Sequence, residues 1–211
     1  MTIMKHIGLV ILMIGLTFSS YSQKSKTAIT TENKHESVEI KNLIRQVLNW
    51  TDSKNSFELL PVLTDSVDSV YVGFDLEEHK QNLEKLKSAG FFATEFIDNY
   101  NQIILTLDKG LRSGEYEVWL VGNLPPFIFA NGASPWCICQ DNMDWNTVEV
   151  DIISLDNEKG ELEWYWENLD PETDESWEVF KYKFRVVKED NIWKVAYMEG
   201  FDFKEGIRKS G

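Results

Sequence analysis

Few side chains in this sequence combine the residue type and the spacing that catalysis requires. Histidine most readily exchanges protons near neutral pH, and beyond residue 22 the chain contains only His35 and His79. Both are expected to be solvated, and neither lies in a nucleophile motif such as G-x-S-x-G. The sequence has no Walker A, H-E-x-x-H or G-x-G-x-x-G pattern. Hydrolase and nucleotide chemistry is therefore not indicated, and no cofactor is expected.

One acid–base pair remains as a hypothesis. A lyase or isomerase needs a general base and a hydrogen-bond donor in one pocket, and Asp151 with Tyr182 is the pair chosen for those roles. Burial would raise the carboxyl pKa toward neutrality, as proton abstraction requires. We favour the alternative that the chain is not an enzyme.

The two cysteines, Cys137 and Cys139, are one residue apart and have no other cysteine to pair with. In an oxidising compartment they are expected to form a disulfide with each other or to stay free. A strained bond in so small a ring would be easily reduced, which indicates a redox-active or conformational device. The alternatives are a local loop clip and two buried thiols. Zinc is not expected, because two more soft ligands are missing.

These cysteines lie in a stretch, residues 122–146, that has no clear period and contains Phe127, Phe129 and Trp136. Long irregular loops in compact domains are often functional. We expect these three aromatic residues to form the lip of a ligand pocket. The alternative is that they fill the core at that place.

Two further aromatic residues, Trp164 and Trp166, share one face of an expected strand. Exposed aromatic ladders can stack on flat ligands. A core stripe is the competing interpretation, because a sheet covered by helices needs large apolar residues on its inner face.

Carboxylates cluster in residues 167–178 and again at Asp141 and Asp144. Such oxygen ligands suit calcium. The spacing does not match an EF-hand loop, so a solvated acidic loop is favoured and no metal site is predicted.

Composition and charge argue against nucleic acid as a partner. The chain of 211 residues has 43% hydrophobic residues and a net charge of −14, which is typical of a folded acidic protein. An acidic surface repels phosphates, so nucleic acid is not an expected partner.

The first 22 residues have the features of a secretory signal peptide. Lys5 precedes an apolar run over residues 7–18, and Ser20 and Ser22 are small residues before the expected cut. The run is shorter than the roughly 20 residues that span a bilayer, and no membrane insertion is expected. We therefore predict an exported protein, periplasmic or extracellular, with a flexible leader over residues 23–33.

Helical periodicity is confined to the first half of the chain. Apolar residues recur at helical spacing in residues 34–48, 75–88 and 96–111. A helical turn is expected at residues 56–60 and a short strand at residues 70–74. Helices therefore precede most of the strands.

From residue 116 onward the period is two. Strands are expected at residues 116–121, 147–155, 161–167, 177–188 and 192–199, with turn residues between them. The pattern predicts an α+β domain whose N-terminal helices pack on one face of a curved antiparallel sheet.

In the last hairpin three aromatic residues alternate with three basic ones, and Trp193 follows the turn on the return strand. These residues are Phe180, Tyr182 and Phe184, and Lys181, Lys183 and Arg185. The hairpin resembles that of NTF2-like, cystatin-like α+β domains. The resemblance implies helices in the concave face of a curved sheet, with a cone-shaped pocket. It implies one domain over residues 34–203 and a tail over residues 204–211, and it carries over no catalytic residue.

Three classes of function follow from these features. The first, which we favour, is an exported noncatalytic domain that binds a small apolar or aromatic ligand or a protein partner. The second is a lyase or isomerase that uses the acid–base pair. The third is an inhibitor or immunity-type protein whose acidic surface meets a basic target.

Overall fold

The computed structural model describes residues 31–141, 144–170 and 172–210, so the expected signal peptide and the first eight residues of the leader lie outside it. The fold is α+β, as expected. The longer helices are α1 (Thr31–Thr51), α2 (Leu76–Ala89) and α3 (Thr94–Ser113). The strands are β1 (Val62–Asp65), β2 (Val70–Phe74), β3 (Trp119–Leu120), β4 (Val148–Leu155), β5 (Lys159–Trp166), β6 (Tyr182–Glu189) and β7 (Ile192–Met198). The short helices are η1 (Trp145–Thr147), α4 (Glu175–Glu178), η2 (Glu199–Phe201) and α5 (Phe203–Gly206).

The helices begin and end where their capping residues place them. The side chain of Asp75 accepts hydrogen bonds from the backbone N–H groups of Glu77 and Glu78, and it starts α2. Gly90 and Gly114 end α2 and α3 with φ of 75° and 73°, a conformation that costs glycine little. The three helices expected from periodicity are therefore confirmed. The expected helical turn at residues 56–60 is wrong, because no helix covers those residues.

Strands β4 to β7 form one antiparallel meander, which we call sheet B. The β6–β7 turn contains Asp190 and Asn191, with φ of 53° and 62°. Two adjacent positive φ values match the type I′ turns that close tight hairpins. Both expected hairpins are thus present, although β6 begins at Tyr182, later than expected.

A second antiparallel sheet, sheet A, contains β1, β2 and β3 in that order. Residues 116–121 are expected from the sequence to form the first strand of a single sheet. That prediction was wrong, because only Trp119 and Leu120 form a strand, and they pair with β2. The Trp119 ring is buried and lies 4.4 Å from the ring of Tyr71. This ring contact holds the segment on sheet A and away from sheet B.

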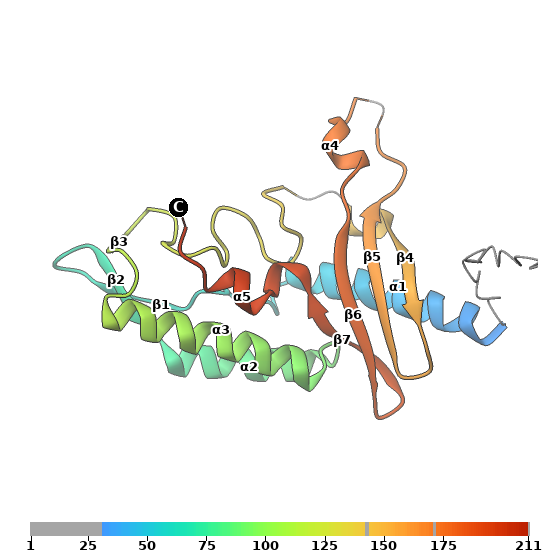
Figure 1. Cartoon of the computed structure of the whole chain (residues 1–211), viewed down its shortest axis with the longest axis horizontal. Coiled ribbons are helices and arrows are strands. Elements are labelled where there is room, and N and C mark those ends of the chain that lie inside the picture. The colour runs from blue at the N-terminus through green and yellow to red at the C-terminus, as the bar shows by residue number, and fades with distance from the viewer. Residues whose placement is uncertain (1–30, 142–143, 171, 211) are drawn as a thin grey trace, which may run out of the picture.

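Figure 1 shows sheet B upright at one end of the molecule, with α1 crossing it, while sheet A, α2 and α3 extend toward the other end. Ion pairs anchor α1 to the sheet: Lys41 and Arg45 both contact Glu149 on β4, and Glu36 lies 2.5 Å from Lys188 on β6. Among the described residues, no helix combines the length and hydropathy needed to cross a membrane.

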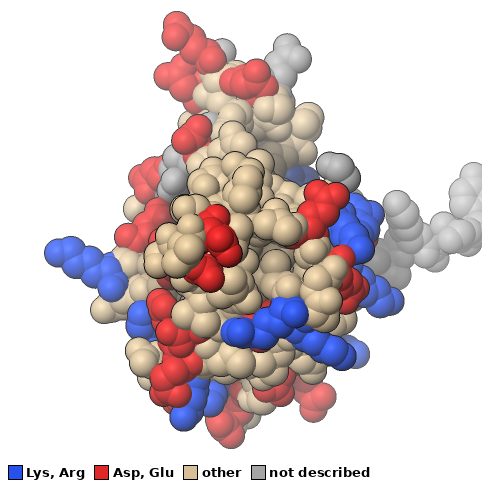
Figure 2. Space-filling model, turned by 90° about the vertical axis from the view of Figure 1, so that its left-hand side faces the viewer, with Lys and Arg blue, Asp and Glu red and all other residues tan. Residues whose placement is uncertain are grey.

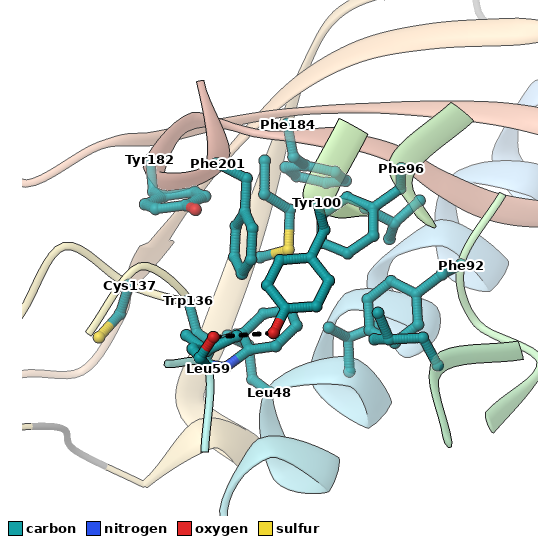
Figure 3. Close-up of a cluster of buried hydrophobic side chains, with 14 of the residues drawn as sticks. Leu48, Leu59, Phe92, Phe96, Tyr100, Trp136, Cys137, Tyr182, Phe184 and Phe201 are labelled. Atoms are coloured by element: carbon teal, nitrogen blue, oxygen red, sulfur yellow. Dashed lines mark hydrogen bonds between the residues drawn. The ribbon is translucent and has the colours of Figure 1, made fainter. Parts of the chain in front are cut away.

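Aromatic side chains dominate the core between these parts (Figure 3). Phe96 stacks on Phe92 at 4.8 Å, and Phe201 packs 4.9 Å from Phe96. Tyr100 donates a hydrogen bond of 2.8 Å to the carbonyl of Leu59, the dashed line in Figure 3. Because Phe201 follows β7 and Phe96 lies on α3, this cluster joins the helices to sheet B.

The C-terminal segment expected to be a tail contacts the rest of the domain. Its residues continue α5, and the backbone N–H of Ile128 donates to the carbonyl of Arg208 at 2.9 Å. The N–H of Ser210 donates to the carbonyl of Pro126 at 3.1 Å. The chain end therefore supports the long loop after β3.

His79 differs from the sequence expectation, because it is buried and not solvated. Only 3% of the residue is exposed, and its Nε2 lies 2.9 Å from the Oδ1 of Asn101. Burial lowers the pKa of His79, and the hydrogen bond to Asn101 offsets this only in part. The neutral imidazole is thus part of the packing between α2 and α3.

The lowered pKa of His79 predicts acid sensitivity. Below its ordinary pKa of 6.5 the unfolded chain binds a proton that the folded chain does not, so the free energy of unfolding falls as the pH drops. We expect urea unfolding to show a loss of at most about 1.4 kcal/mol per pH unit from this group between pH 6.5 and the folded pKa. When the pH falls from 7.5 to 5.5, the free energy of unfolding should decrease less in His79→Gln than in the wild type. The exposed His35 gives the control, since His35→Gln should keep the wild-type dependence.

Candidate functional site

The structure places Asp151 and Tyr182 on opposite faces of sheet B. In the register Asp151 lies opposite Glu163, whereas Tyr182 lies opposite Trp164. Successive residues of a strand alternate between faces. Asp151 is half exposed and its carboxylate is 2.5 Å from the Nζ of Lys181, while Tyr182 is fully buried. The two side chains do not share a pocket, as the lyase or isomerase hypothesis requires.

Tyr182 instead ties the long loop after β3 to sheet B. Its hydroxyl donates to the carbonyl of Pro135 at 2.7 Å and accepts from the N–H of Gly200 at 2.9 Å. Burial raises the pKa of Tyr182 well above its ordinary value, so the donor proton stays in place. A Cβ at position 200 would lie 2.0 Å from the carbonyl oxygen of Pro135, so only glycine fits there.

Removing this hydroxyl tests the tie. Tyr182→Phe leaves a buried carbonyl and a buried N–H without their partner, and we expect the free energy of unfolding to fall by about 2 kcal/mol. Tyr165→Phe is the matched control. The Tyr165 hydroxyl is on the exposed face of the sheet, and its hydrogen bond to Asp151 is long, at 3.5 Å. The control should change stability by less than about 0.5 kcal/mol in urea unfolding. Equal losses in the two variants would contradict the role given to Tyr182.

Trp164 and Trp166 lie in the core and present no aromatic face to solvent. They are 0% and 3% exposed. Trp145 stacks on Trp166 at 5.6 Å, and Tyr182 stacks on Trp164 at 5.2 Å. Trp177 packs edge-on against Trp166 at 4.8 Å. Other rings thus occupy the surfaces on which a ligand would stack.

The aromatic side chains of the long loop point into the core. Phe127, Phe129 and Trp136 are 0%, 1% and 7% exposed. Trp136 packs 4.5 Å from Phe201, and Figure 3 shows it inserted between the loop and the helices. These three rings therefore fill the core, which was the alternative to the lip. Phe129 and other residues of the same loop also form the wall of a hollow.

This hollow, which we call the loop hollow, has a volume of about 310 Å³. It lies between the long loop and the chain from η2 to α5, and most of its wall is apolar. Its lining residues are Ile128, Phe129, Ala130, Asn131, Ala133, Ser134, Pro135, Ile138, Glu199, Gly200, Asp202, Glu205 and Gly206. The volume is at the lower end for small-molecule sites.

Two wall residues of the loop hollow have a left-handed backbone. Ala130 and Ile138 have φ of 56° and 53°. Asn and Asp tolerate this region, but a β-branched residue such as Ile138 is a clear outlier there. Such conformations cost about 1–3 kcal/mol each and gather at functional sites and ligand clamps. Their place in one wall marks the loop hollow as the candidate site.

The Cys137–Cys139 disulfide holds Ile138 in this wall. The two sulfurs are bonded, and the Cα atoms are 5.1 Å apart. Within the loop, the N–H of Ser134 donates to the carbonyl of Cys139 at 2.9 Å, and the N–H of Ile138 donates to the carbonyl of Ser134 at 2.7 Å. Loop-closure entropy for so short a ring is only about 1.6 kcal/mol. The bond therefore shapes the wall more than it stabilises the fold.

The rim of the loop hollow is acidic. It contains Glu199, Asp202 and Glu205, and among the described lining residues there is no Lys, Arg or His. Arg208 pairs with Glu205 at 3.2 Å just outside the lining. Burial, with the nearby charges of Asp202 and Glu199, raises the pKa of Tyr197 to about 12. The local field is thus negative and disfavours an anionic ligand.

Two more hollows adjoin the same loop. One of about 610 Å³ lies across Ala133, Ser134 and Pro135 and is bounded on its far side by residues 56–60. A smaller one of about 100 Å³ is lined by both cysteines, together with Asp52 and Asp141. The loop segment is therefore a ridge between hollows.

Exposed apolar side chains gather elsewhere, at the end formed by the β1–β2 hairpin and β3. Val67, Val118, Leu120 and Leu124 are 88%, 77%, 47% and 64% exposed. Figure 2 looks onto this end and shows uncharged surface near its centre, with charged side chains around it. This end takes no part in the loop hollow.

No cluster of three or more His, Cys, Asp or Glu side chains among the described residues is arranged to hold a metal ion. In the acidic loop after β5, Asp170 and Asp174 accept hydrogen bonds from backbone N–H groups of their own loop. The side chain of Ser176 and then its backbone N–H, both hydrogen-bonded to Asp174, lower the pKa of that carboxyl. Both carboxylates thus have a role in turn formation.

No protein-family model, no curated protein and no solved structure matches this chain.

Sequence reasoning missed most of the hollow's wall. Ile138 carried a usable signal, because a residue between two bonded cysteines must close a very small ring. Ala130 has no local signal, and the rim carboxylates come from the end of the chain, about 70 residues away in sequence. Only folding brings these parts together.

The left-handed backbone of Ile138 makes a prediction. Ile138→Gly relieves about 1–3 kcal/mol of strain at an entropy cost of about 1 kcal/mol, so we expect the free energy of unfolding to rise by about 1 kcal/mol. Ile128→Gly, in the same hollow but without positive φ, should lower it by about 1 kcal/mol. Urea unfolding measures both. A similar loss in both variants would show that Ile138 is not strained.

Proposed function

We propose that this chain is an exported, noncatalytic binding domain that holds a small apolar ligand, neutral or positively charged, in the loop hollow. The observation that carries this proposal is the pair of left-handed wall residues, Ala130 and Ile138, at one apolar hollow. The core does not account for this strain, because the Ile138 residue is 48% exposed. The disulfide holds Ile138 in this conformation, and backbone outliers of this kind cluster at active sites and ligand clamps.

The lining supports a ligand of limited size and charge. Ile128, Pro135 and Ile138 offer hydrocarbon surface, so binding would draw on the removal of apolar area from water. A volume of about 310 Å³ suits one or two fused rings or a short branched chain. The carboxylates of Glu199 and Asp202 at the rim favour a cation over an anion.

A noncatalytic role agrees with the contacts of Asp151 and Tyr182, the two residues of the acid–base pair. Asp151 contacts Lys181 on the exposed face, and the hydroxyl of Tyr182 is engaged by Pro135 and Gly200. Neither side chain lines the loop hollow. Of the carboxylates that do line it, Asp202 accepts from the Tyr197 hydroxyl at 3.4 Å and from the backbone N–H of Glu205 at 3.0 Å, and Glu199 accepts from the backbone N–H of Lys183 at 2.9 Å, so both are already engaged within the chain.

Export and family relationship are further parts of the proposal. Export rests on the residue pattern of positions 1–22. The relation to NTF2-like domains rests on the last hairpin and on α1, which crosses sheet B as such a helix would. The three strands of sheet A have no counterpart in the single curved sheet of that expectation.

Two dyes that differ only in charge test the binding site. N-phenyl-1-naphthylamine is neutral, and 8-anilino-1-naphthalenesulfonate adds one sulfonate to the same rings. Fluorescence titration of the chain, expressed with its own N-terminal segment and purified from the exported fraction, should give at least tenfold tighter binding of the neutral dye. This ratio corresponds to about 1.4 kcal/mol of repulsion at the rim.

Ala133→Phe puts a ring into the loop hollow and should lower the affinity for the neutral dye by at least tenfold. Val118→Phe adds the same ring at the β3 end, where the side chain is 77% exposed, and should leave binding unchanged. If both variants weakened dye binding equally, or if the sulfonate dye bound more tightly than the neutral dye, the loop hollow would not be the binding site. A chain found only in the cytoplasmic fraction with Met1 retained would contradict export.

A further inference from the structure

We infer that the Cys137–Cys139 disulfide is a thiol–disulfide exchange site, at which a dithiol reductant switches the loop hollow from a binding to a nonbinding form. The inference rests on the proposed function, since it concerns the regulation of that site. It begins from the position of Ile138, the residue between the two cysteines, in the wall of the hollow.

The two cysteine residues differ in their exposure. The Cys137 residue is 2% exposed, whereas Cys139 is partly exposed. Figure 3 shows the Cys137 side chain at the margin of the aromatic cluster, directed away from Trp136. Both cysteines also line the small hollow beside the loop, which is open to solvent. A reductant therefore reaches Cys139 first.

Cleavage of the bond would not release the loop from the core. Trp136 packs 4.5 Å from Phe201, and the carbonyl of Pro135 accepts the hydrogen bond from Tyr182. Neither contact involves sulfur, and a disulfide that closes so short a ring adds little to global stability. The effect of reduction is thus confined to the residues around Ile138.

The bond keeps Ile138 in a conformation that the residue would otherwise leave. With φ of 53°, a β-branched residue is in the least favourable of the allowed regions. Once the ring opens, Ile138 relaxes to negative φ, and its side chain leaves the wall of the loop hollow. The hollow then loses apolar surface on the side of the disulfide.

The surrounding charges favour a switch over an oxidoreductase. Catalytic cysteines need a cation or a helix N-terminus that stabilises the thiolate. The described lining beside Cys139 contains the carboxylates of Asp52 and Asp141 and no Lys, Arg or His. The described surroundings of the pair therefore lack the cation with which a catalytic cysteine stabilises its thiolate.

The exchange balances in two steps. A thiolate of the dithiol attacks the Sγ of Cys139, the bond to Cys137 breaks, and the Cys137 sulfur leaves as a thiolate that takes up a proton. The second thiol of the reductant, as its thiolate, then attacks the mixed disulfide and releases Cys139. The products are two protein thiols and the oxidised, cyclic form of the reductant.

Reduction of the native protein with dithiothreitol tests the switch. We expect N-phenyl-1-naphthylamine to bind the reduced chain at least tenfold more weakly, with a melting temperature within a few degrees of the oxidised value, and reoxidation to restore binding. When the reduced chain is treated briefly with iodoacetamide, Cys139 should be alkylated before Cys137. The masses of the labelled peptides show the order. The double variant Cys137→Ser with Cys139→Ser should bind the dye as weakly as the reduced chain and should not respond to dithiothreitol.

Three results would overturn the inference: unchanged dye affinity after reduction, unfolding on reduction, or a bond that excess dithiothreitol cleaves only in denaturant. A failure of the proposed function is distinguishable, because the oxidised chain would then bind no dye. In that case hydrogen exchange at residues 134–139 tests the conformational part of the inference alone: faster exchange on reduction supports the relaxation of Ile138, and unchanged exchange overturns it.

Discussion

The hydrogen bonds of the Tyr182 hydroxyl are the contact on which the arrangement of the site depends. This one oxygen joins the carbonyl of Pro135 in the long loop to the N–H of Gly200 in η2. The hydroxyl is buried, so both bonds form where water cannot compete for them. The tie determines where the loop enters the core and where its outer side is exposed.

The long loop has two roles because its inward and outward residues differ in kind. Phe129 and Trp136 pack against rings of α3 and η2, whereas Phe127 packs against Phe74 and Trp119 of sheet A. All three hold the loop by buried apolar area. Between them, Ala130 and Ala133 are small and Ile138 is exposed, which leaves the loop hollow open. A rigid wall requires a firmly packed inner side, so the packing of the loop in the core supports the binding role that we propose for its outer side.

The elements of regular structure were largely predictable from local pattern. The residues of α2, with Asp75 before it and Gly90 after it, contain their own start and stop signals. The hairpin turn at Asp190 and Asn191 likewise specifies its own geometry. Predictions failed where local pattern was weak: at residues 116–121, where pairing with β2 decided the outcome, and at His79, whose burial depends on its contact with α3.

The sequence by itself determined the helices, the two hairpins of sheet B, the acidic character and the pairing available to Cys137 and Cys139. Only the tertiary structure decided that Asp151 and Tyr182 face opposite sides of a sheet, and that Ile138 meets the rim carboxylates of the chain's last segment. The physical reason is the difference in sequence range between the interactions that form these features. Capping, turns and hydrophobic periodicity act within a few residues, whereas the loop hollow forms between segments separated by about 70 residues, which no local interaction brings together.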